Sequence, residues 1–137
     1  MRLIGAGPAA LVVAAVLASC GQPGADLFVV QRSGQGTGAA LTLRVADDGF
    51  VRCNGGPRRR MSDDQLLLAR EIQRELDGDA KQRVSRPPGP RSVLSYSVKL
   101  ESGTVRFSDT SPGISTEERK AAAFTREVAT GVCGLAR

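Results

Sequence analysis

The sequence predicts an α+β domain, a small antiparallel sheet with two helices in the order β-β-β-α-β-β-α. Three observations support this prediction. Short segments that alternate apolar and polar residues indicate strands, and glycine-containing turns separate them. Two longer segments carry apolar residues three and four positions apart, which is typical of helices that pack on a core. The strand segments fall into a group of three and a group of two, and one helix follows each group.

The first group is predicted to be a meander of three strands. Residues 27–32 are rich in β-formers, residues 41–45 alternate apolar and polar side chains, and residues 50–53 resume extended structure. The segment 33–38 separates the first two strands with three glycines, and residues 47–49 (Asp-Asp-Gly) form a turn signal. The short connections favour direct neighbours in the sheet.

The first helix is predicted to begin after Ser62 and to end at Gly78. Ser62 and Gln65 match a capping box, in which the serine hydroxyl accepts from the third helical amide and the glutamine reaches back. Glycine is common just after a helix, which suggests Gly78 as its end. The apolar stripe of this helix consists of Leu68, Ala69, Ile72 and Leu76.

The second half of the chain is predicted to hold a hairpin and a helix. Residues 79–92 are proline-rich and are expected to be irregular. Residues 93–100 and 104–108 alternate clearly and form the best hairpin in the sequence. A second capping box opens at Ser115 with Glu118. The stripe of this second helix consists of Ala121, Phe124 and Val128, and Gly131 follows the helix.

The N-terminal segment has the pattern of an export signal. Arg2 supplies a positive start, residues 9–16 are apolar, and small residues precede Cys20. Because a cysteine follows the small residues directly, the pattern resembles a bacterial lipoprotein lipobox. The resemblance implies cleavage before Cys20 and a diacylglyceryl group on its thiol. An ordinary secretory signal and an uncleaved membrane anchor are the alternatives.

The lipoprotein interpretation sets the expected domain boundaries and location. Residues 1–19 would be the signal peptide, residues 20–26 a lipidated tether, and residues 27–137 a single α+β domain. Two acyl chains give lasting attachment, whereas one is marginal. We therefore expect the protein at the cell membrane, lipid-anchored on its extracytoplasmic face.

Cys53 and Cys133 are predicted to form a disulfide. Cys20 belongs to the lipid, and a remaining pair in an exported protein is expected to be oxidised. Metal binding is the alternative, but two isolated cysteines in a chain without histidine make a poor zinc site. We expect neither a metal nor another cofactor.

The charged residues exclude some functions and leave others open. The formal net charge is +5, and the clearest basic cluster is the run of arginines at 58–60. Such a run can bind anionic lipid or wall polymer, although it also fits a solvated loop. No aromatic residues lie between the arginines to stack on bases, so no nucleic-acid partner is expected.

No residue pattern points to catalysis. The chain has no histidine, which excludes the usual serine and cysteine triads. Three pairs of adjacent carboxylates have structural explanations: the first pair below lies in a predicted turn, and the other two lie at predicted helix N-termini. These pairs are Asp47-Asp48, Asp63-Asp64 and Glu117-Glu118. We therefore expect a protein that is not an enzyme.

Several short motifs resemble the emfourins, bacterial inhibitors of thermolysin-type metalloproteases. They are residues 30–34, the helix opened by residues 62–64, and the hairpin segments 96–98 and 105–109. The resemblance implies a protease as partner. It places Ser33 and Gly34 at the interface, where the family carries a Ser-Gly-Gly-like element, and Gln35 replaces the second glycine. The whole chain also resembles lipoproteins of high-GC bacteria.

Two functions are expected from these observations. The first is a membrane-anchored, non-enzymatic lipoprotein whose domain binds a protein partner, with protease inhibition as its specific form. The alternative is a structural envelope module that binds anionic wall polymer through its basic loop.

Overall fold

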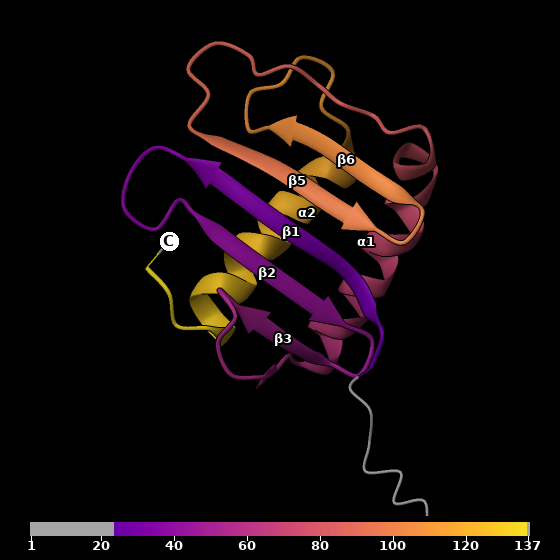
Figure 1. Ribbon diagram of the computed structural model, residues 1–137, viewed down its shortest axis with the longest axis vertical. Coiled ribbons are helices and arrows are strands. Elements are labelled where there is room, and N and C mark those ends of the chain that lie inside the picture. The colour runs from indigo at the N-terminus through magenta and orange to yellow at the C-terminus, as the bar shows by residue number, and fades with distance from the viewer. Residues whose placement is uncertain (1–23, 137) are drawn as a thin grey trace, which may run out of the picture.

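Six antiparallel strands form one sheet, and two helices cover one of its faces (Figure 1). The structure is a computed structural model that describes residues 24–136. The strands are β1 (Asp26–Gly34), β2 (Leu41–Ala46), β3 (Phe50–Cys53), β4 (Arg59–Arg60), β5 (Leu94–Leu100) and β6 (Gly103–Ser108). The helices are α1 (Asp63–Lys81) and α2 (Thr116–Glu127), and a π-helical turn (Val128–Val132) continues α2. The predicted α+β class is confirmed.

The sheet order is β4-β3-β2-β1-β5-β6, so β1, the first strand of the predicted meander, joins that group to the hairpin of β5 and β6. It pairs with β2 on one side and with β5 on the other, where Val30 faces Leu43 and Val98. The alternation in the sequence sends these apolar side chains to the helix-covered face. Polar residues such as Gln31 and Thr42 lie on the opposite, open face.

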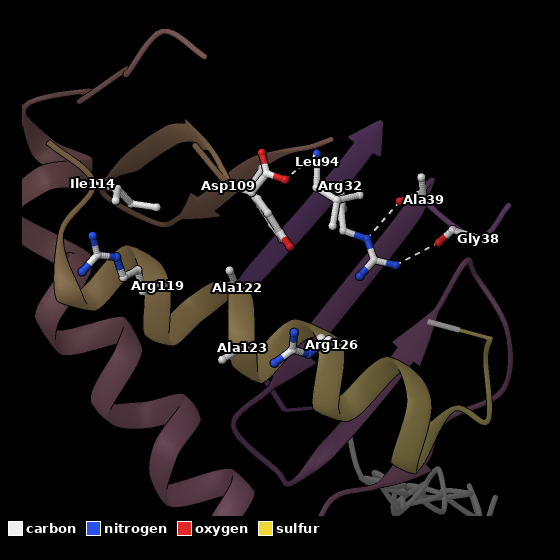
Figure 2. A pocket seen from close by; sticks show the side chains of 11 residues that line it. Arg32, Gly38, Ala39, Leu94, Asp109, Ile114, Arg119, Ala122, Ala123 and Arg126 are labelled. Carbon is white, nitrogen blue, oxygen red and sulfur yellow. Dashed lines mark hydrogen bonds between the residues drawn. The ribbon is translucent and has the colours of Figure 1, made fainter. Parts of the chain in front are cut away.

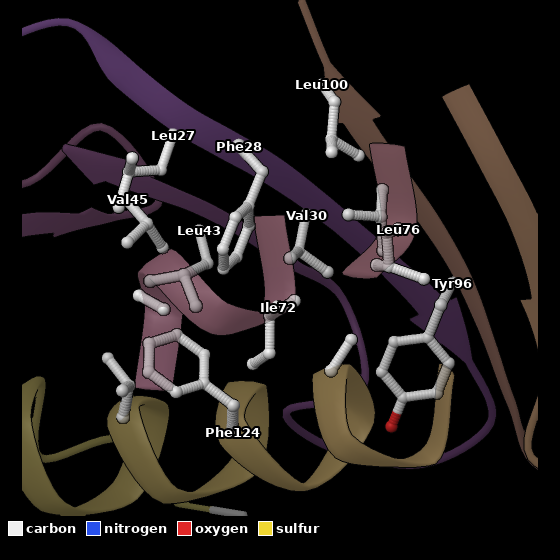
Figure 3. Close-up of a cluster of buried hydrophobic side chains, with 14 of the residues drawn as sticks. Leu27, Phe28, Val30, Leu43, Val45, Ile72, Leu76, Tyr96, Leu100 and Phe124 are labelled. Atoms are coloured by element: carbon white, nitrogen blue, oxygen red, sulfur yellow. The ribbon is translucent and has the colours of Figure 1, made fainter. Parts of the chain in front are cut away.

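The core fills the space between the sheet and both helices (Figure 3). Phe28 from β1 meets Phe124 from α2 in an edge-to-face contact, with ring centroids 5.9 Å apart. Ile72 and Leu76 from α1 are fully buried beside them. The apolar stripes predicted from helical spacing therefore face the core, as amphipathic helices require.

A disulfide joins the end of β3 to the chain after the π-helical turn. The sulfur of Cys53 is bonded to that of Cys133, across 80 positions of sequence. The predicted bond is present, and it ties the first strand group to the C-terminal helix.

The predicted end of the first helix was wrong. Gly78 lies inside α1, which continues to Lys81. Glycine inside a helix costs about 1 kcal/mol relative to alanine. The extra turn buries Ala80 completely and forms an ion pair between Asp77 and Lys81, and these contacts offset that cost.

Only half of the second capping box forms. The Ser115 hydroxyl accepts from the Glu118 amide at 3.1 Å. The Glu118 side chain does not reach back to Ser115, because it is fully buried and accepts from Arg86 Nε at 2.7 and 3.0 Å. The Ser62–Gln65 box of α1 is complete, with 3.2 and 2.9 Å for its two bonds.

The stretch before β5 is more structured than the sequence indicated. The amide of Arg86 donates to the Arg106 carbonyl, and the Arg106 amide donates to the Val84 carbonyl. These bonds cover the exposed edge of β6, where unpaired backbone groups would otherwise face solvent. The same stretch delivers the Arg86 side chain to Glu118.

The first strand begins one residue earlier than predicted and ends two residues later. β1 begins at Asp26, inside the predicted tether, and the Gly24 amide donates to Asp48 at 3.0 Å. The predicted signal peptide and Cys20 lie outside the described residues. Between residues 24 and 136, the structure contains no helix long and apolar enough to span a membrane.

Candidate functional site

The predicted contact residues Ser33 and Gly34 belong to β1 and not to the loop that follows. Ser33 pairs with Ser95 of β5, and Gly34 pairs with Leu94. Both are exposed, and Ser33 lies on the open face of the sheet. The true β1–β2 loop spans residues 35–40 and is almost entirely exposed. A protruding loop on a rigid sheet is a common place for recognition.

Gly34 is needed for the backbone itself. Its φ is +153°, and a Cβ at this position would lie 2.0 Å from the carbonyl oxygen of Val93. Strand β5 approaches so closely that a side chain does not fit without moving the backbone.

We predict that Gly34→Val lowers the free energy of unfolding by roughly 2 kcal/mol, because it combines a steric clash with backbone strain. Urea denaturation measures the loss, with Ser33→Ala as the control at the neighbouring exposed position. Equal stability of the two variants would contradict this account of Gly34.

Beside the loop, a cavity of about 350 Å³ opens between α2 and the sheet (Figure 2). We call it the arginine groove. Three arginines line it, Arg119 and Arg126 from α2 and Arg32 from β1. The remaining lining residues are Gly38, Ala39, Leu94, Tyr96, Asp109, Ile114, Ala122 and Ala123. No pattern in the sequence had indicated this groove.

Arg32 connects the groove to the β1–β2 loop. Its side chain is on the helix-covered face and the residue is only 6% exposed. Nε donates to the Ala39 carbonyl and Nη2 to the Gly38 carbonyl, each at 2.9 Å (Figure 2). A hydrogen bond also joins its side chain to that of Tyr96. A buried guanidinium needs such partners, and here they fix the end of the loop.

The opposite wall of the groove is fixed by Asp109. Its carboxylate accepts from the amides of Val93 and Leu94 at 3.1 to 3.2 Å and from the Ser92 hydroxyl at 3.1 Å. These bonds hold the start of β5 against the end of β6. The groove is therefore bounded by two preformed hydrogen-bonded turns.

Tyr96 gives a direct probe of the groove, because it is the single tyrosine of the chain. Burial raises the pKa of its hydroxyl, and the nearby Arg32 charge and hydrogen bond oppose this rise only in part. We predict that the near-ultraviolet absorbance of tyrosinate appears above the ordinary pH of about 10 in the folded protein. The unfolded chain loses this proton first, so the free energy of unfolding falls as the pH rises above about 10.

A spectroscopic pH titration measures the midpoint, and the denatured protein is its control. Tyr96→Phe should remove this component of the pH dependence. A folded midpoint at or below that of the denatured chain would show that Tyr96 is not buried as described.

The arginine run is divided between two roles. Arg58 forms an ion pair with Asp48 and lies over the Phe50 ring, 4.0 Å from its centroid. Arg59 and Arg60 form β4 and are exposed, and within residues 24–136 neither forms an ion pair. The expected solvated loop is thus a short edge strand with two exposed guanidinium groups.

The acidic residues of the 47–49 turn have structural partners. Asp47 pairs with Arg70, 2.7 Å away. The Gly24 amide is the main cause that lowers the pKa of Asp48, and the Phe50 amide and the Arg58 charge act in the same direction. Within the described part of the chain, no group of three or more acidic, cysteine or histidine side chains is arranged to hold a metal ion.

Comparisons of this chain with protein-family models, curated proteins and solved structures found no match.

Proposed function

We propose that the protein is a membrane-anchored extracytoplasmic lipoprotein whose domain binds a protein partner through the distal end of its sheet. We define the distal end as the β1–β2 loop, residues 92–94 and residues 108–110. The observation that supports this proposal is the direction of β1. This strand begins at Asp26, the last residue of the predicted tether, and leads into the β1–β2 loop at its other end (Figure 1). Nine residues of strand separate the two by about 26 Å.

This arrangement suits recognition away from a membrane. A lipid on Cys20 would hold the Asp26 end of the sheet near the bilayer, so the distal end would face outward. The loop carbonyls of Gly38 and Ala39 are already fixed by Arg32. A preorganised loop loses less conformational entropy on binding, which favours affinity.

The disulfide supports export. Stable disulfides form in oxidising compartments and are rare in the cytosol of most organisms. The Cys53–Cys133 bond agrees with the export signal that the N-terminal residues predict.

The anchor is tested by Cys20→Ala. Wild-type protein should sediment with membranes and carry the mass of a diacylglyceryl group, and the variant should be soluble or remain unprocessed. Ser19→Ala, which keeps a small residue before the cysteine, serves as the control and should behave as wild type. Unchanged mass and membrane attachment in Cys20→Ala would contradict lipidation.

The partner is tested by a crosslinking pull-down from envelope extract, and then by assays with the purified partner. For the inhibitor form of the proposal, thermolysin-type metalloproteases are mixed with increasing amounts of the protein. Saturable loss of protease activity is the expected result. Proteases that stay fully active at high excess would refute inhibition, while a direct one-to-one complex with another protein would leave the binding function intact.

One observation favours the alternative, a module that binds anionic wall polymer. Arg59 and Arg60 are exposed side by side on an edge strand. Polymer binding through them should be abolished by salt and by Arg59→Gln/Arg60→Gln. Retention on polymer that resists both changes would exclude this mode.

A further inference from the structure

Within residues 24–136, the arginine groove has two arginines, Arg119 and Arg126, whose charge the fold does not pair. Three guanidinium groups line it against one carboxylate, that of Asp109. Asp109 is occupied by amides and a hydroxyl of residues 92–94. Within residues 24–136, neither Arg119 nor Arg126 forms an ion pair or a side-chain hydrogen bond, and both are exposed.

The spacing along α2 places these two arginines on one face. They are seven positions apart, which is two helical turns and about 10.5 Å along the axis. Ala122 and Ala123 lie between them in α2, and both line the groove (Figure 2). Because the alanine side chain is only a methyl group, little projects from the helix between the two arginines. This part of the helix surface forms the floor of the groove.

The groove also has an apolar component. Leu94 and Ile114 lie on its walls, and both are half-buried. A ligand here would bury carbon atoms against these side chains while its charge meets the arginines. Its volume of about 350 Å³ is within the range of small-ligand sites.

We propose that the arginine groove is a carboxylate-binding site, which takes an organic ligand with two or more carboxylates. The planar guanidinium fork matches a carboxylate with two parallel hydrogen bonds. Two carboxylates on alternate residues of an extended peptide lie about 7 Å apart on one side of the chain. The two arginine side chains are long and flexible, so guanidinium groups that start about 10.5 Å apart along the helix axis can reach carboxylates about 7 Å apart.

The same chemistry can come from two sources. The proposed function favours an acidic segment of the protein partner as the source. With this source, the inference rests on the proposed function. A free di- or tricarboxylic acid is the other source. The groove adjoins the β1–β2 loop through Gly38 and Ala39, so an acidic segment of a partner at the distal end would reach it.

Binding is measured by fluorescence anisotropy on the full chain, purified from membranes in detergent. The probe is a labelled, end-blocked peptide that contains two glutamates separated by one alanine, and the same peptide with glutamines is its control. Citrate is the competitor, and its direct binding is measured separately by isothermal titration calorimetry. We expect saturable binding of the glutamate peptide, weakening with salt, and none of the glutamine peptide.

The decisive variants remove equal charge at two places. Arg119→Gln/Arg126→Gln should weaken peptide binding at least tenfold. Arg59→Gln/Arg60→Gln removes the same charge from β4 and should change binding less than twofold. Arg119→Lys/Arg126→Lys keeps the charge but loses the planar fork, and should give an intermediate loss. All three pairs of substitutions are exposed, so the fold should be retained.

The results of these experiments distinguish an acidic peptide from a free acid as the ligand, and they test the groove separately from the protein-binding function. Competition by citrate with Arg119- and Arg126-dependent binding supports the site, and citrate binding without peptide binding identifies a free acid as the ligand. If Arg119→Gln/Arg126→Gln and Arg59→Gln/Arg60→Gln lost peptide affinity equally, or if neither the peptide nor citrate bound, the proposed site would be wrong. A partner found by pull-down that binds Arg119→Gln/Arg126→Gln as well as wild type would refute the groove's role in that complex and leave the protein-binding function standing.

Discussion

Replacement of both Cys53 and Cys133 by alanine is expected to lower the free energy of unfolding by about 4.5 kcal/mol. The bond closes a loop of 80 positions, and a long loop loses much conformational entropy in the unfolded chain when it is closed. The bond also holds the end of β3 against the chain that follows α2. A domain of this size has a total stability of only about 5–15 kcal/mol, so this change removes a large share of it.

Chemical denaturation of the double variant measures this loss. Wild-type protein in reducing agent is the matched control and should unfold at a similar denaturant concentration. A double variant within about 1 kcal/mol of oxidised wild type would show that the disulfide contributes little, contrary to the chain-entropy argument.

Arg86→Ala is expected to lower the free energy of unfolding by about 3 kcal/mol. The Glu118 side chain is 0% exposed, and the Arg86 side chain is 27% exposed. The substitution would leave the Glu118 carboxylate buried without its charged partner. Truncating one member of such a pair costs more than the pair itself contributes, because the remaining charge has lost its hydration.

Two further variants identify the cause. Arg74→Ala removes an exposed arginine of α1 and should change stability by less than about 0.5 kcal/mol. Arg86→Met/Glu118→Leu removes both charges and should recover most of the loss. If the double variant were as unstable as Arg86→Ala, lost packing and not an unpaired charge would be the explanation.

Local patterns in the sequence predicted most of the fold. The alternation in residues 93–100 places Tyr96, Val98 and Leu100 on the buried face, as observed. The Ser62–Gln65 capping box formed as predicted, because its two partners are only three positions apart in the chain. The disulfide was predicted from the number of cysteines together with the predicted export signal. These features depend on short-range geometry or on a single possible pairing.

Features that depend on distant contacts were missed or misjudged. Glu118 matched a capping box in sequence, but Arg86 approaches from a stretch 32 positions away and takes its carboxylate. The two residues of β4 are too few for an alternating pattern. Gly78 stayed helical because packing of Ala80 outweighed a local propensity.

The arginine groove shows how much of a site the sequence could reveal. The stripe of Ala121, Phe124 and Val128 fixes the buried face of α2, so Arg119 and Arg126 could have been placed together on the outer side. Arg32 could not have been placed there. The loop, which the local pattern does not place, returns the Gly38 and Ala39 carbonyls to this inward-facing arginine of a central strand and stabilises it there.

The central claim, recognition at the distal end of the sheet, is tested most directly by site-specific photo-crosslinking in intact cells. A photoreactive residue replaces Thr37, which is exposed in the β1–β2 loop, or Glu101, which is exposed in the β5–β6 turn near the start of β1. The account predicts a discrete, saturable protein adduct from position 37 and none from position 101. Equal labelling from both positions, or an adduct from position 101 alone, would contradict it.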